Sequence, residues 1–276
     1  MMNRIKHHKS LLTIAVLLII LLFLVIFQTR GAGTSRTEER KRISLVVYGD
    51  DTERWENLRQ GADLVCKRSS ADLSLLTTLS ENDTAEQTEI IDREIEDGAD
   101  ALIIAACNSS GIREHMDSIR PDIPVVFVES IEDANSKEMF IAPDDYNMGL
   151  DLGRSIAENE SDIVTVAIIS ENTDRDCVKL REKGLRDALE GKVGRITDWK
   201  RDERNMQVPT RVFIQKAVVS EATDVIVTFD NTATDALLDA LANLNKKSKV
   251  YSISTSNEAV YSLYKGEIKT LEYQDT

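Results

Sequence analysis

The chain is poor in the side chains on which metal binding and nucleophilic catalysis depend. Its 276 residues include three cysteines and three histidines. Cys66, Cys107 and Cys177 are odd in number, widely spaced and without a CxxC pair, which excludes a disulfide framework. Two histidines precede a long apolar segment, and His115 has no cysteine or histidine near it, which excludes a zinc site and a histidine-based triad. We expect no metal, no cofactor and no catalytic residue, and three buried free thiols, with one bridged pair as the alternative.

Phosphate-binding motifs and a basic surface are also missing. No GxGxxG follows the first apolar strand and no GxxxxGK[ST] occurs, which disfavours a dinucleotide or nucleotide site. After residue 30 the chain has 30 basic residues against 48 acidic ones. A surface of that charge repels nucleic acid and anionic lipid, so we expect no nucleic-acid partner and favour a neutral or cationic small ligand.

One long apolar segment, residues 11–27, is present near the start of the chain. At about 1.5 Å per residue it spans roughly 25 Å, enough for a thin bilayer. Basic residues without any acid precede it, which keeps the N-terminus in the cytoplasm. We expect a cytoplasmic N-terminus (1–10), a single-pass signal anchor (11–27), a linker (28–42) and an extracytoplasmic domain. A cleaved signal peptide is the alternative, although 31–33 is a poor cleavage site, and a buried core helix is disfavoured because nothing polar interrupts the run.

Apolar strand patterns alternate with amphipathic helix patterns from residue 43 onwards. The runs 43–48 and 101–106 are apolar on both faces, which is typical of a parallel sheet covered on both sides. About ten such units are too many for one compact sheet, so we predict an α/β fold of two Rossmann-like lobes with parallel sheets. The predicted boundaries are 43–276 for the domain, about 43–142 for lobe 1, about 146–253 for lobe 2, and crossings near 142–147, 253–256 and 274–276. The last strand is predicted to begin at Leu271.

Ligands of open parallel sheets bind beyond the carboxyl ends of the strands. The residues just past each predicted strand are nearly all polar, and several are Asn, Ser or Asp, which suits a ligand rich in hydroxyl groups. These positions are 49–52, 107–108, 129–130, 170–172, 230–231 and 254–255.

A series of short motifs follows the same order and spacing as in one known family. These are the strand 43–48 with Trp55 six residues before Gly61, EIEDGADALII at 94–104, PVVFVES at 124–130, IAPDDYNMG at 141–149, REKGL at 181–185, FDNTATDAL at 229–237 and YKGEI at 264–268. In this the chain resembles the type I periplasmic sugar-binding proteins, the ribose- and galactose-binding group that shares its fold with the effector domains of LacI-type repressors. That family normally continues for a few more elements, so the resemblance implies that the sequence is truncated or that the fold closes differently.

The resemblance implies a cleft between the lobes that holds a small sugar or polyol. The residues that it places there are Asp51, Thr52, Trp55, Glu129, Ser130, Arg181, Asp230, Ser254 and Gln274. At two of these positions, Ser130 and Ser254, the family often has an arginine and an acid, so the contact set of a ribose-binding protein is incomplete.

Physical chemistry agrees with this set but allows a simpler interpretation of each member. Trp55 can stack on a pyranose ring or be a core aromatic. Glu129 and Asp230 can accept hydrogen bonds from hydroxyl pairs or be solvated acids at strand ends. Arg181 can span two ligand oxygens with its rigid fork or pair with an acid on the preceding turn, Asp174 or Asp176. Gln274 can donate and accept at once, or serve in a hinge without touching the ligand.

We therefore expect a membrane-anchored solute-binding protein that closes by hinge motion around a sugar or polyol. Its partner is an ABC permease or an extracytoplasmic sensor such as a histidine kinase. The alternative is a sensor module that binds a partner protein and signals to a histidine kinase. An enzyme is disfavoured because the adjacent acids 50–51 and 144–145 point to opposite sides of an extended chain. A transcription regulator is disfavoured because an apolar segment stands where a DNA-binding headpiece is needed.

Overall fold

The computed structural model describes residues 40–51, 54–130, 139–161, 163–201 and 208–273. The predicted N-terminus, signal anchor and most of the linker lie outside the described residues, as do Thr52 and Gln274. Within the described ranges, no helix combines the length and the apolarity needed to cross a membrane.

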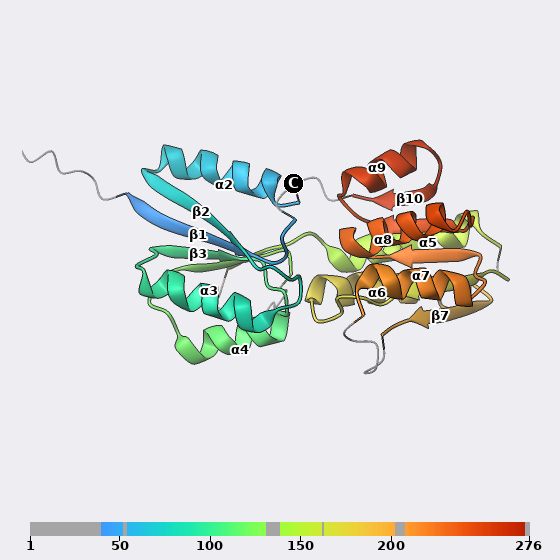
Figure 1. Cartoon of the computed structure of the whole chain (residues 1–276), viewed down its shortest axis with the longest axis horizontal. Coiled ribbons are helices and arrows are strands. Elements are labelled where there is room, and N and C mark those ends of the chain that lie inside the picture. Colours follow the sequence, from blue (N-terminus) through green and yellow to red (C-terminus); the bar gives the residue numbers. More distant parts are fainter. Residues whose placement is uncertain (1–39, 52–53, 131–138, 162, 202–207, 274–276) are drawn as a thin grey trace, which may run out of the picture. The chain divides into compact units, whose positions relative to one another are not determined.

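Two five-stranded sheets, each wholly parallel, organise the chain (Figure 1). The first has the order β2-β1-β3-β4-β5 and the second the order β10-β9-β8-β6-β7. The predicted α/β class with two parallel sheets is thus confirmed. The first sheet consists of β1 (Lys41–Val47), β2 (Ala71–Thr77), β3 (Ala101–Ile104), β4 (Val125–Val128) and β5 (Met139–Ile141). The second consists of β6 (Thr165–Ile169), β7 (Arg195–Trp199), β8 (Val225–Thr228), β9 (Lys249–Ile253) and β10 (Ile268–Glu272).

The helices follow the strands in alternation. The first half of the domain has α2 (Glu56–Arg68), α3 (Thr84–Glu96) and α4 (Ser109–Ile119). The second half has α5 (Asp145–Asn159), α6 (Asp176–Leu189), α7 (Thr210–Ser220), α8 (Asn231–Asn243) and α9 (Asn257–Tyr264). In the first half, α3 and α4 pack on one face of the sheet and α2 on the other (Figure 1). Several helices begin with a capping acid or amide, which explains why the sequence starts them there; Asp83, Asn108, Asp144 and Asp230 each accept a hydrogen bond from a backbone N–H of the first turn.

Two features differ from the sequence-based expectation. A crossing between lobes was expected near 253–256, but this segment joins β9 to α9, which leads to β10 of the same sheet. The reason is local: the Ser256 hydroxyl accepts a hydrogen bond from the Ala259 amide and so starts a helix. The last strand was expected to begin at Leu271, but β10 begins at Ile268, whose side chain is buried while the next, Lys269, is exposed.

An unusually close contact joins α5 to α6. A Cβ atom at Gly149 would lie 1.9 Å from the backbone oxygen of Arg181, and one at Gly184 would lie 2.0 Å from the backbone oxygen of Tyr146. Only glycine allows the two backbones to come this close. The contact matters for the site because Arg181 lies on α6 directly opposite the first turn of α5.

Candidate functional site

A cavity of about 640 Å³ lies where strand ends and helix starts of both halves meet. Its lining includes five of the predicted site residues, Trp55, Glu129, Arg181, Asp230 and Ser254. Asp51 lines a neighbouring cavity of about 940 Å³ instead. The two cavities have Arg54, Asn57, Asn231 and Thr255 in common, so they adjoin.

Trp55 borders the cavity but is mostly a core residue. Only 4% of it is exposed, and its indole N–H donates to the Tyr48 carbonyl at 3.0 Å. The Tyr48 ring meets it edge to face, with the ring centroids 5.1 Å apart, and the Arg54 guanidinium carbon lies 4.9 Å from the Trp55 ring centroid. The simpler interpretation, a core aromatic, describes most of what this side chain does here.

Glu129 forms an ion pair that the sequence did not reveal. Its carboxylate lies 2.5 Å from the Arg54 guanidinium and accepts a hydrogen bond from the Tyr48 hydroxyl at 3.2 Å. Burial alone would raise the pKa of Glu129, but Arg54 and then Arg181 hold it below the ordinary value. The backbone of Glu129 is in the left-handed region, with φ of 65°, a strained conformation for a residue with a side chain. The backbone is therefore strained at the end of this strand, where the Glu129 side chain lines the cavity.

Arg181 is fixed by two hydrogen bonds. Its Nε donates to Asp145 at 2.7 Å and its Nη1 donates to the Phe229 carbonyl at 2.8 Å. The predicted partner on the preceding turn, Asp174 or Asp176, is therefore wrong: the ion pair of Arg181 is with Asp145, and Asp176 pairs with Arg113 and Lys179. The close contact of α5 and α6 decides this, because it brings Asp145 of α5 next to the Arg181 side chain. The guanidinium is thus held rigidly in the cavity wall.

Two polar residues at the start of α8, Asp230 and Asn231, line the cavity next to the end of β8, the middle strand of the second sheet. Asp230 accepts hydrogen bonds from the Ala233 amide at 2.8 Å and from Asn172 at 3.0 Å. The Asn231 side-chain oxygen accepts from the Ser254 hydroxyl at 3.0 Å and the Thr255 amide at 2.9 Å. Asn231 was among the residues at predicted strand ends but not in the predicted site.

Direct side-chain contacts join the two halves beside the cavity. Arg175 is fully buried, and its Nη2 donates to the Glu81 carboxylate at 3.1 Å, to the Glu81 carbonyl at 3.1 Å and to Asn82 at 3.2 Å. Its guanidinium carbon lies 3.8 Å from the Tyr48 ring centroid. Asn82 in turn donates to Asn172 at 2.9 Å. Neither Arg175 nor Glu81 was in the predicted site.

The remaining predicted residues have simpler positions. Ser130 is fully buried and lines neither cavity, and its hydroxyl has no hydrogen-bond partner among the described residues. Thr52 and Gln274 lie outside the described residues. The three thiols are free and buried. Among the described residues no group of three or more His, Cys, Asp or Glu side chains could hold a metal ion.

Comparison with known proteins explains this arrangement. Residues 43–276 match a family described as the periplasmic binding protein domain. The chain belongs to this family. The predicted resemblance to the type I periplasmic sugar-binding proteins is therefore confirmed, and members of the family are solute-binding proteins rather than enzymes.

Individual periplasmic binding proteins are similar to the chain at low identity. It is 23% identical over 168 residues to the ABC transporter periplasmic-binding protein YphF of Escherichia coli (strain K12), a match that covers 58% of this chain and 51% of that protein, so the chain spans about half the length of this curated relative. A periplasmic sugar-binding protein of Legionella pneumophila has the same fold, with a TM-score of 0.72, 19% identity and coverage of 85% of this chain and 89% of that one. So does a carbohydrate transporter solute-binding protein of Agrobacterium radiobacter in complex with D-arabinose, with a TM-score of 0.70, 18% identity and coverage of 86% and 83%.

Proposed function

We propose that this protein is an extracytoplasmic solute-binding protein that binds a small sugar or polyol in the cleft between its two halves and delivers it to an ABC permease. The proposal rests on one observation above all: a rigid arginine, Arg181, shares a cavity wall with neutral polar groups of Asn231 and Ser254. Sugar hydroxyls need both donors and acceptors in fixed positions, and this wall supplies both. Family membership and the sugars bound to relatives of the same fold support the same ligand class.

The proposed site consists of Asp51, Thr52, Trp55, Glu129, Arg181, Asp230, Ser254 and Gln274, to which the geometry adds Arg54 and Asn231. Ser130 is left out of it because it is fully buried and lines neither cavity. The proposed cellular position is outside the cytoplasm, with residues 11–27 as a single-pass anchor that keeps the protein near its partner. Tethering of this kind raises the local concentration of the binding protein at the membrane without any gain in affinity.

A matched pair of substitutions on α6 tests the proposal. The full-length chain in detergent micelles is screened by thermal shift against mono- and disaccharides, polyols and nucleosides, since a ligand at 100 times its Kd stabilises the fold by about 2.7 kcal/mol. Arg181→Lys keeps a charge opposite Asp145 but loses the fork, so the affinity for the best ligand should fall by a factor of about ten or more, the value of about 1.5–3 kcal/mol for a charged hydrogen bond.

Arg186→Lys is the control, because Arg186 lies five residues further along the same helix and does not line the cavity. Its affinity should be unchanged. A folded chain that responds to no member of the panel would rule out the proposed ligand class.

One feature favours the sensor alternative, in which the domain binds a partner protein and signals to a histidine kinase. Apolar side chains are exposed beside the cavity: Val65 is 61% exposed, Met139 64% and Ile141 63%. Contiguous exposed apolar surface marks interaction sites. A photo-crosslinker at Val65 should then join the domain to a membrane kinase in intact cells, whereas one at Val219, which is equally exposed on α7, should not.

A further inference from the structure

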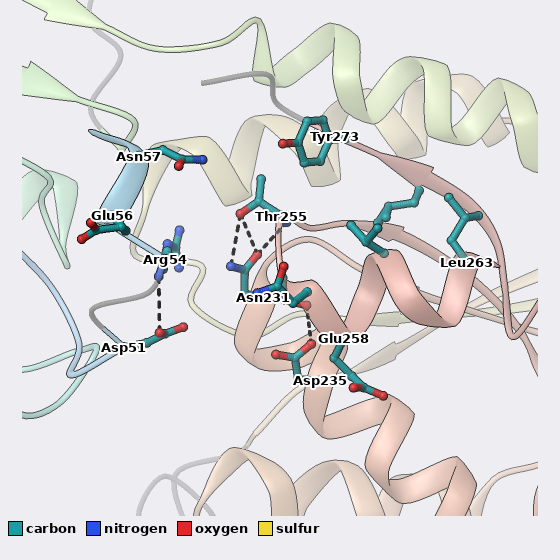
Figure 2. Close-up of a pocket in the computed structure, with 14 residues that line it drawn as sticks. Asp51, Arg54, Glu56, Asn57, Asn231, Asp235, Thr255, Glu258, Leu263 and Tyr273 are labelled. Atoms are coloured by element: carbon teal, nitrogen blue, oxygen red, sulfur yellow. Dashed lines mark hydrogen bonds between the residues drawn. The ribbon is translucent and has the colours of Figure 1, made fainter. Parts of the chain in front are cut away.

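The larger cavity, of about 940 Å³, has several carboxylates in its lining (Figure 2). It lies between the start of α2, the starts of α8 and α9, and the end of β10. Among the described residues, its lining has four carboxylates, Asp51, Glu56, Asp235 and Glu258, and one cation, Arg54, whose charge is already paired with Glu129. A volume of this size lies within the range of roughly 300–1,000 Å³ found for small-molecule sites.

Two of these carboxylates, Asp235 and Glu258, come from α8 and α9 and share one wall of the cavity. Glu56 pairs with Arg59, but Asp235 has a neutral partner, the Ser256 hydroxyl, at 2.6 Å. Burial, followed by the nearby carboxylates of Glu258, Asp51 and Asp230, raises the pKa of Asp235 to about 6. Figure 2 shows Asp235 and Glu258 close together on the wall opposite Arg54. A cationic group placed there would relieve this repulsion.

A second observation points to a ligand in the same place. The Arg54 side chain is only 9% exposed, and its Nη2 donates to Tyr48 at 2.7 Å and to Glu129 at 2.5 Å. Its Nη1 is buried and has no hydrogen-bond partner among the described residues. A buried donor without an acceptor costs about 1–3 kcal/mol, so an acceptor supplied from the cavity that Arg54 lines would be favoured.

The two observations together define a ligand with an oxygen acceptor and a cation. We propose that the cleft binds an amino sugar, with a ring or hydroxyl oxygen accepting from Arg54 Nη1 and the ammonium lying beside Asp235 and Glu258. This inference rests on the proposed function and narrows its ligand class. A divalent metal does not fit, because no three of the lining carboxylates, nor any others in the described ranges, come close enough together to hold one.

Paired sugars test the inference directly. The full-length chain in micelles is titrated calorimetrically at pH 7.0 with D-glucosamine, D-galactosamine and D-mannosamine, each against its parent hexose and its N-acetyl derivative. The best amino sugar should bind at least tenfold more tightly than both of its neutral counterparts. In Asp235→Asn this preference should shrink to threefold or less, while the affinity for the parent hexose stays within a factor of three.

Asp239→Asn is the matched control, because Asp239 lies one turn further along α8, is paired with Arg211 at 2.8 Å and does not line the cavity. It should keep the full preference. A parent hexose that binds as well as its amino sugar would overturn the amine inference and leave the proposed function in place. A linear diamine, 1,4-diaminobutane, that binds as well as the best amino sugar would also overturn it, and binding of no sugar at all would overturn both proposals.

Discussion

Two buried arginines in the cleft should differ in how much stability the protein loses when each is replaced by methionine. Arg181 and Arg175 are 6% and 1% exposed at the side chain, and each is paired with a carboxylate of another element. Methionine keeps an unbranched apolar side chain and removes the charge. The comparison therefore isolates what each guanidinium contributes.

Arg181→Met should be the costly change. The partner of Arg181, Asp145, is 1% exposed, and the substitution removes the guanidinium that is paired with this buried carboxylate. Breaking a buried pair from one side costs about 3–5 kcal/mol. For a domain of this size, about 1 kcal/mol corresponds to roughly 2–4 °C in Tm, so we expect a loss of about 10 °C.

Arg175→Met should cost much less. Two nitrogens of Arg175, Nε and Nη1, are buried without a hydrogen-bond partner, a penalty of about 1–3 kcal/mol each that the substitution removes. Against this stand the lost bonds of Nη2 and the stacking on Tyr48, worth about 2 kcal/mol when desolvated. Its acidic partner, Glu81, is 23% exposed and can regain water. The opposing terms nearly cancel, so we expect a net loss within about 2 kcal/mol.

Tryptophan fluorescence during thermal unfolding measures both changes. The two tryptophans, Trp55 and Trp199, are buried in different halves of the domain, so the signal reports on each half. Arg186→Met serves as the partly exposed reference and should change stability by less than about 1 kcal/mol. Equal losses for Arg175→Met and Arg181→Met would refute the reasoning from unpartnered nitrogens.

Three further predictions concern packing, pH and thiols. Gly149→Ala should lower Tm by several degrees, because the added methyl group would collide with the Arg181 backbone oxygen. Gly61→Ala, at an exposed position of α2, should be neutral or stabilising by up to about 1 kcal/mol, and differential scanning calorimetry compares the two variants. The pKa of Asp235 is raised to about 6 in the folded state, so between about pH 4 and 6 the native state binds more protons at this group than the unfolded state does. The stability that Asp235 contributes therefore falls as the pH rises through this range. Asp235→Asn should raise Tm at pH 7, and this gain should vanish near pH 4. Burial raises the pKa of the Cys177 thiol to about 12, so this thiol should react slowly with a thiol reagent in the native protein and fully after denaturation. Fast reaction of the native protein would contradict the burial of its thiols.

The sheets could be predicted from the sequence because their strands are apolar on both faces. Runs such as 101–106 and 163–170 leave few alternatives to a buried parallel strand, and the residues that follow them necessarily gather at one edge of a sheet. Glu129, Asp230 and Ser254, which line the smaller cavity, were predicted in this way. The weaker β10 was predicted to start too late, because Lys269 interrupts the apolar run while pointing outward.

The pairing of charges across the cleft could not be predicted in the same way. Arg54, Glu81 and Arg175 lie in or beside charged loop segments, where an arginine or glutamate normally faces solvent. Their burial depends on which loops of the two halves meet, and periodicity within one segment contains no information about that. The partner of Arg181 was predicted wrongly for a related reason. An acid nearby in the sequence was expected, but the glycines at 149 and 184 let α5 approach α6 closely, so that Asp145 of α5 is the partner instead.

Charge pairing in the cleft also decides what kind of ligand it can accept. Arg54, Arg175 and Arg181 are each matched by a carboxylate at hydrogen-bond distance, so none offers an unpaired positive charge. An anionic ligand would have to compete with these carboxylates and would face Asp235 and Glu258 across the larger cavity. A neutral hydroxyl needs only an N–H that is still without an acceptor, and an ammonium gains from the acids that remain. We therefore expect the three ion pairs that fix these arginines to turn the selectivity of the proposed site away from acids and towards neutral or cationic ligands.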